Sequence, residues 1–134
     1  MKKMTLVVML LMFTLLAALN CSWKPKPILE EEELLKLLTK MQNGIEAKIS
    51  YNDFGKLLIE SKNMLELLKK AENKNSCFFN AVTKCYTSFE ISKKAWKLRD
   101  EAETEKRKID MDTTLSFALG FGSVSLAKAK ECFK

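Results

Sequence analysis

The 134-residue sequence contains no histidine. Without an imidazole there is no Ser-His or Cys-His nucleophile pair, no histidine general base and no histidine-ligated zinc, copper or haem. The four cysteines also lack C-x-x-C spacing, which argues against a thiol redox enzyme. We therefore expect a protein that is not an enzyme and that binds no metal or cofactor.

The sequence also lacks internal repeats, low-complexity tracts and any sign of a second domain. Its length supports one domain with one modest core. The formal charge is +6, and removal of Lys2 and Lys3 with an export signal would leave +4. This mildly basic balance suits anionic lipid or an acidic partner. It is too evenly mixed with glutamate to predict a nucleic-acid partner.

The first 20 residues have the three parts of an export signal. Lys2 and Lys3 precede an uncharged stretch of 16 residues, from Met4 to Leu19, with the small residues Ala17 and Ala18 near its end. A helix needs about 20 apolar residues to cross a bilayer. The stretch therefore predicts a cleaved signal peptide over residues 1–20 rather than a retained membrane anchor.

The cleavage region Ala18-Leu19-Asn20-Cys21-Ser22 resembles the signal of bacterial lipoproteins, in which the cysteine receives the lipid. Ala18 stands where leucine is usual, and Asn20 where glycine or alanine is usual. Ordinary cleavage after Ala18 is the alternative, although Leu16 departs from its small-x-small rule. The resemblance covers residues 1–27. It implies lipidation of Cys21 and a periplasmic or outer-membrane location, whereas ordinary cleavage implies a secreted protein.

Residues 21–27 form a predicted tether, since Pro25 and Pro27 alternate with lysines and favour extended structure. The domain then covers residues 28–134. Its first helix is expected over 28–43, with acidic residues 30–33 in the first turn and Gly44 at the end. The second is expected over 50–72, capped by Ser50 with Asp53 three residues later.

The third predicted helix covers 76–108, with Ser76 as its cap and an apolar stripe on one face. The stripe consists of Phe78, Val82, Cys85, Phe89 and Trp96. A turn at 109–112 leads to the fourth helix, over 112–133, with Asp112 or Thr113 as its cap. Four amphipathic helices joined by short turns predict an all-α, antiparallel four-helix bundle with up-down-up-down topology.

The fourth predicted helix carries a row of small residues at helical spacing. The row consists of Ala118, Gly122, Ser125, Ala129 and Cys132. Small rows let two helix backbones approach closely. We expect this row to pack inside the bundle, and a homodimer contact through it is the alternative.

The bundle topology predicts which cysteines meet. Residues equidistant from a turn face each other in an antiparallel pair, and the midpoint of residues 85 and 132 is 108.5, beside the predicted turn. The midpoint of 77 and 132 is 104.5, which would require the third helix to end early. We therefore expect a Cys85–Cys132 disulfide. Cys77 is then free, linked between molecules or, if Cys21 is not lipidated, paired with Cys21.

Three functions are compatible with these features. The first is a small exported, non-enzymatic helical-bundle (lipo)protein of the cell envelope, with a structural role or an unknown protein partner. Its candidate partner surface is the mixed-charge end of the third helix: Arg99, Asp100, Glu103, Lys106, Arg107 and Lys108.

The second function is a carrier of a small hydrophobic ligand in the bundle core. Its candidate cavity lining is aromatic: Phe54, Phe78, Phe89, Trp96 and Phe117. Simple filling of the core by these side chains is the more economical interpretation. The third function is an envelope immunity or inhibitor protein.

Overall fold

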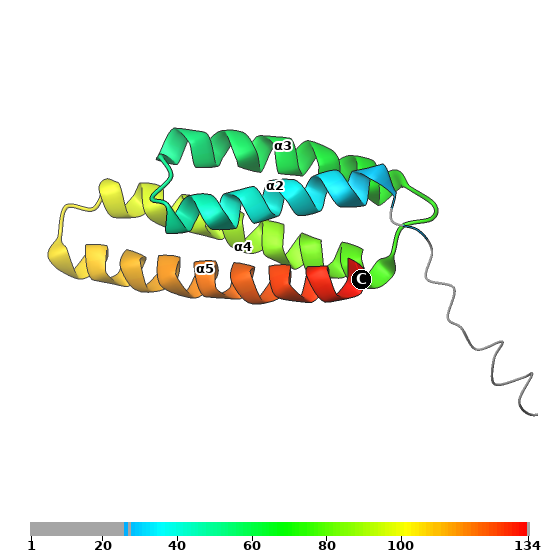
Figure 1. Cartoon of the computed structure of the whole chain (residues 1–134). Coiled ribbons are helices and arrows are strands. Elements are labelled where there is room, and N and C mark those ends of the chain that lie inside the picture. The colour runs from blue at the N-terminus through cyan, green and yellow to red at the C-terminus, as the bar shows by residue number, and fades with distance from the viewer. Residues whose placement is uncertain (1–25, 27, 134) are drawn as a thin grey trace, which may run out of the picture.

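The computed structural model describes Lys26 and residues 28–133, and it consists of four α-helices (Figure 1). They are α2 (Leu29–Glu46), α3 (Tyr51–Lys70), α4 (Ser76–Asp100) and α5 (Glu105–Phe133). The described residues contain no strand. The prediction of an all-α four-helix arrangement is confirmed. The predicted export signal and most of the tether, including Cys21, lie outside the described residues.

Side-chain caps fix the starts of two helices close to the predicted positions. The Ser50 hydroxyl accepts a hydrogen bond from the Asp53 backbone N–H at 3.1 Å, as expected for a capping serine. At α4 the cap is Asn75, whose Oδ1 accepts from the Phe78 N–H at 3.2 Å. Ser76, the predicted cap, is therefore the first helical residue.

The end of α2 differs from the prediction. The helix continues through Gly44 to Glu46, and the left-handed residue that follows is Lys48, with φ of 58°. Gly44 is instead a packing position, because a Cβ there would lie 2.9 Å from the Ile49 Cδ1. Its lack of a side chain serves close approach rather than the turn.

The turn between the last two helices lies earlier than predicted. α4 ends at Asp100 and α5 begins at Glu105, so the predicted boundaries at 108 and 112 are wrong. Thr104 begins the new helix, since its hydroxyl accepts from the Arg107 N–H at 3.3 Å. The connecting residues include no glycine or proline, and Ala102 is buried in the turn. Nothing in the hydrophobic periodicity marked this break.

Two helical hairpins build the bundle (Figure 1). α4 packs along α5 and also contacts α2 and α3, while α2 contacts all three other helices. The α4–α5 hairpin is longer than the α2–α3 hairpin, and its turn extends beyond the rest of the bundle (Figure 1). One end of the molecule is therefore made by two helices alone.

The core lies between the hairpins and is aromatic at its centre. Phe54 and Phe89 pack edge to face with ring centroids 6.0 Å apart, and Phe78 packs against Phe133 at 5.5 Å. The predicted stripe of the third helix is confirmed in large part. Phe78, Val82, Cys85 and Phe89 are fully buried, and Trp96 is half-buried.

The small-residue row of α5 packs inside the bundle, as expected. Ala118, Gly122, Ser125 and Ala129 are buried. A Cβ on Gly122 would lie 2.6 Å from the Phe89 ring, so the ring occupies the space that glycine leaves. Because these four residues are buried, they are not accessible for the alternative, a homodimer contact through the row.

Candidate functional site

The cysteine pole, formed by Glu31, Asn75, Cys77 and Cys132, joins three parts of the chain. The buried Glu31 carboxylate accepts hydrogen bonds from the Asn75 N–H at 2.7 Å and the Ile28 N–H at 3.4 Å. The Asn75 side-chain amide donates to the Cys132 carbonyl at 2.9 Å. The start of α2, the start of α4 and the end of α5 are therefore held together at one end.

A disulfide completes the pole and corrects the predicted pairing. Cys77 is bonded to Cys132, with Cα atoms 5.7 Å apart, and Cys85 has no disulfide partner. The early turn is the reason. The midpoint of residues 77 and 132 is 104.5, beside the observed turn. The Cys85–Cys132 pairing relied instead on the predicted turn at 109–112, which is wrong. The alternative Cys77–Cys21 bond is also wrong, because Cys77 is already bonded to Cys132.

Cys85 is a buried thiol in the core. Burial raises its pKa to about 12, and the charge of Lys130 opposes that shift only in part. The thiolate is the reactive form of cysteine, so Cys85 remains protonated and unreactive at neutral pH. It packs as a small apolar side chain.

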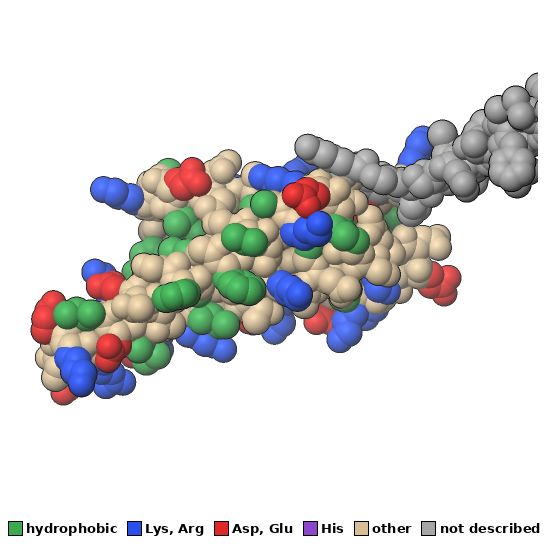
Figure 2. All heavy atoms as spheres, turned by 90° about the horizontal axis from the view of Figure 1, so that it is seen from below, with side chains coloured by type: hydrophobic (Ala, Val, Ile, Leu, Met, Phe, Trp, Pro, Cys, Tyr) green, Lys and Arg blue, Asp and Glu red, His purple; other side chains and the backbone are tan. Residues whose placement is uncertain are grey.

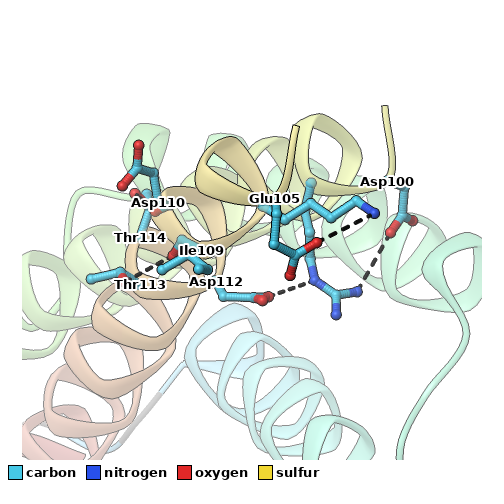
Figure 3. A network of polar contacts seen from close by, with 9 residues as sticks. Asp100, Glu105, Ile109, Asp110, Asp112, Thr113 and Thr114 are labelled. Carbon is cyan, nitrogen blue, oxygen red and sulfur yellow. Dashed lines mark hydrogen bonds and ion pairs between the residues drawn. The ribbon is translucent and has the colours of Figure 1, made fainter. Parts of the chain in front are cut away.

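The tip, residues 99–108, holds the whole predicted partner surface. Arg99 pairs with Asp112 across the two helices and with Asp100 at 3.6 Å, while Lys108 lies 4.0 Å from Glu105 (Figure 3). All six predicted residues are exposed: Arg99, Asp100, Glu103, Lys106, Arg107 and Lys108.

Part of the tip has charge without a local counter-charge. Within the described chain, no ion pair joins Glu103, Lys106 or Arg107 to another side chain. These three groups are solvated and available to a partner. The Arg99–Asp112 pair instead holds the two helices together at the base of the tip.

The predicted cavity lining is not brought together into a cavity. Phe54, Phe78 and Phe89 fill the core, Trp96 lies at its edge, and Phe117 is 77 % exposed on the other side of the hairpin. The expectation that these five side chains share one cavity is wrong. Phe117 lies one residue from the buried Ala118, which turns it outward by about 100°.

An apolar cleft of about 530 Å³ does exist where the α2–α3 connection meets the α4–α5 hairpin. Phe54 and Trp96 form its inner wall, and Arg99 and Asp112 lie at its polar edge. The remaining apolar lining comes from both hairpins: Ile45, Ile49, Leu115 and Leu119. Two of the predicted aromatics therefore contribute to a real surface depression.

The outer face of the α4–α5 hairpin carries apolar side chains that the sequence reasoning missed. Phe121 is 64 % exposed and Val124 is 70 % exposed, beside Phe117. These residues recur at i, i+4 and i+7, which places them on one side of α5. Figure 2 shows hydrophobic side chains gathered along this face of the molecule. This spacing was a usable signal in the sequence, but it lies beside the small-residue row of the same helix, which drew the attention instead.

A groove of about 590 Å³ runs beside these side chains, between α4 and α5. Thr83, Thr87, Ser88 and Ile91 line it on α4, and Phe117, Ala118 and Phe121 line it on α5. Contiguous exposed apolar surface rimmed by polar residues is typical of interaction sites.

The part of the chain that the structure describes lacks two other kinds of site. No helix there is long and apolar enough to span a membrane. No group of three or more acidic, histidine or cysteine side chains gathers there to hold a metal ion.

Comparison of the chain with protein-family models, with curated proteins and with solved structures found no match. Function must therefore be inferred from the chain's own cysteine pole, tip, cleft and outer face.

Proposed function

We propose that the chain is an exported, non-enzymatic lipoprotein of the cell envelope that binds a protein partner through its tip. One observation carries this proposal. The two ends of the bundle differ, because one is joined by a disulfide and buried hydrogen bonds, and the other is a projecting hairpin with solvated charges. The first end is built for rigidity, and the second has accessible charged groups.

The anchor belongs at the cysteine pole. Glu31 lies there, and Cys21 precedes Ile28 by seven residues, which span at most about 25 Å when extended. A lipid on Cys21 would therefore keep the pole close to a membrane.

The disulfide pattern supports lipidation. Cys77 and Cys132 use each other, and Cys85 is buried in the core. Cys21 is then left without an accessible cysteine in the same molecule. A free thiol is uncommon in an oxidising compartment, so a thioether to lipid accounts for Cys21 without requiring a link between molecules.

The tip can be tested by reversing charges that leave the bundle intact. Arg107→Glu with Lys108→Glu should abolish capture of an envelope partner by the tagged mature protein, because charge complementarity controls encounter and specificity. The matched control is Lys40→Glu with Lys62→Glu, which reverses two exposed lysines on α2 and α3. A partner captured equally by both variants would remove the tip from consideration.

The cleft favours a second function, transport of a small hydrophobic ligand. Its apolar walls and the Arg99–Asp112 pair at its edge suit an amphipathic molecule with a polar head. Native mass spectrometry of the purified protein should then show a bound adduct, and Leu119→Trp should displace it by filling the cleft. Protein that is free of any adduct when purified from its own cells would rule out this function.

A further inference from the structure

We propose that the outer face of the α4–α5 hairpin binds the same face of a second copy of the chain, with the two α5 helices antiparallel. This inference goes beyond the proposed function. Its apolar contacts lie outside the tip, and Lys106 is the one tip residue that it uses. It rests on the arrangement of apolar and charged residues along α5, on the neighbouring groove and on the size of the face.

The exposed stripe of α5 is symmetric in a way that suits antiparallel contact. It runs through Asp110, Thr114, Phe117, Phe121, Val124 and Lys128, with the i, i+3 and i+4 spacing of one helix face. Three pairs within this stripe have their midpoint at position 119: 117 with 121, 114 with 124, and 110 with 128. Antiparallel helices crossing at this position would place Phe117 against the partner's Phe121.

The charges at the two ends of this stripe are complementary in the same register. Asp110 of one copy would face Lys128 of the other, and Lys106 would face Glu131, a pair symmetric about position 118.5. Lys128 already pairs with Glu131 at 2.9 Å, so the four groups would alternate in sign. A parallel contact would instead place Lys128 against Lys128, which is unfavourable.

The groove between α4 and α5 provides the matching depression. Small or β-branched side chains form most of its lining, including Thr83, Thr87, Ser88 and Ala118, and Lys84 also lies there. Phe117 and Phe121 project beside the groove. Under a twofold axis, the projecting rings of each copy enter the groove of the other. This is the self-complementary geometry of an isologous dimer.

The face is large enough for a stable dimer. Between residues 106 and 131 α5 extends for about 38 Å at 1.5 Å per residue, and two adjacent helices are about 20 Å wide. The footprint is therefore roughly 750 Å². Stable complexes bury about 800 Å² per partner, so the two areas are similar. The cysteine poles would lie at opposite ends, so two lipid anchors would hold the dimer lengthwise along a membrane.

The test uses the whole mature chain, residues 21–134, with Cys21→Ser to prevent lipidation and intermolecular disulfides. Light scattering coupled to size-exclusion chromatography should give the mass of two chains. Phe117→Ser with Phe121→Ser should raise the dimer dissociation constant by more than about tenfold, as truncation of central aromatics does in other interfaces. The melting temperature of the monomer should stay unchanged, because both rings are exposed.

Charge exchange tests the orientation. Asp110→Lys should weaken the dimer, and adding Lys128→Glu to it should restore the affinity, because the signs are then exchanged at both ends. A dimer unaffected by the two serines would overturn the proposal, and loss of dimer without charge rescue would overturn the antiparallel register. A chain that stays monomeric also overturns it, and cosedimentation of that monomer with phosphatidylglycerol vesicles would assign the face to a membrane instead.

Discussion

At the residue scale, two buried titratable side chains show how the bundle handles polar groups. Glu31 is buried, and backbone N–H groups of Asn75 and Ile28 donate to its carboxylate in place of water. Cys85 stays protonated because burial raises its pKa to about 12. The first side chain therefore stabilises the fold through hydrogen bonds, and the second through packing.

Replacing Glu31 should destabilise the protein more than replacing a neighbouring surface glutamate. Glu31→Ala leaves the Asn75 N–H without its acceptor in a half-buried position, which should cost about 1–3 kcal/mol of unfolding free energy. Glu33→Ala removes only an exposed pair with Lys36 and should cost less than about 0.5 kcal/mol. Urea denaturation of both variants measures the difference. Equal losses of unfolding free energy in the two variants would show that the buried hydrogen bonds of Glu31 add no more stability than an exposed ion pair.

Alkaline pH should destabilise the fold through Cys85 and Tyr86. Burial, followed by the hydrogen bond to Glu90, raises the pKa of the Tyr86 hydroxyl above its usual value. The pKa of Cys85 rises from 9.0 to about 12. A group whose pKa is higher in the folded state contributes its full stability below the unfolded pKa and loses it as pH rises toward the folded pKa.

Unfolding free energy should therefore fall between about pH 9 and 12 through Cys85, by up to about 1.4 kcal/mol per pH unit, and Tyr86 should add to the fall above about pH 10. Chemical denaturation across this range measures the slope. Cys85→Ala and Tyr86→Phe should each make the slope shallower, relative to the disulfide-bonded wild type. An unchanged slope in both variants would contradict the burial of these groups.

At the element scale, three sides of α5 have three different environments. Its small-residue row packs against α4, Leu115 and Leu119 line the cleft, and its outer apolar side chains are exposed. The Gly122 contact with Phe89 fixes the distance between α4 and α5. The spacing of the α4–α5 hairpin therefore depends on a residue without a side chain.

Gly122→Ala should destabilise the protein although alanine is the better helix former. Its Cβ would lie 2.6 Å from the Phe89 Cε1, and overpacking of this kind costs about 1–3 kcal/mol. Gly120 supplies the control, because nothing lies within 4 Å of a Cβ built there. Gly120→Ala should stabilise the helix by about 0.5–1 kcal/mol. In thermal denaturation the melting temperature should fall for Gly122→Ala and rise for Gly120→Ala. A shift in the same direction for both variants would contradict the close approach of Phe89 to Gly122.

The apolar periodicity of each helix was sufficient to predict the four elements and most of the core. The stripe through Phe78 and Phe89 and the cap at Ser50 are examples, because both depend on local spacing. The turn at 101–104 could not be predicted in the same way, since it contains neither glycine nor proline. That single error displaced the hairpin register and led to the wrong cysteine pair.

The exposure of Phe117 shows the other limit of sequence reasoning. The two residues that follow it, Ala118 and Leu119, are buried and half-buried, so a phenylalanine beside them is easily assigned to the core. Only the packing of α5 against α4 decides which side of α5 is left exposed. The charged tip was predictable from composition, but its projection beyond α2 and α3 was not.

At the scale of the whole molecule, the bundle has one covalently joined end and one projecting end. The Cys77–Cys132 disulfide closes a loop with a sequence separation of 55 residues. In the chain-entropy model such a loop contributes about 4 kcal/mol, a large share of the stability of a small domain.

The intact mass of the mature protein, before and after reduction and alkylation, tests the central claim most directly. With a lipid on Cys21, the mass should exceed that of the chain by the lipid, and denaturation without reduction should allow one alkyl group, on Cys85. Reduction should add two more, on Cys77 and Cys132. A lipid-free chain that gains four alkyl groups only after reduction would contradict both the anchor and the free Cys85.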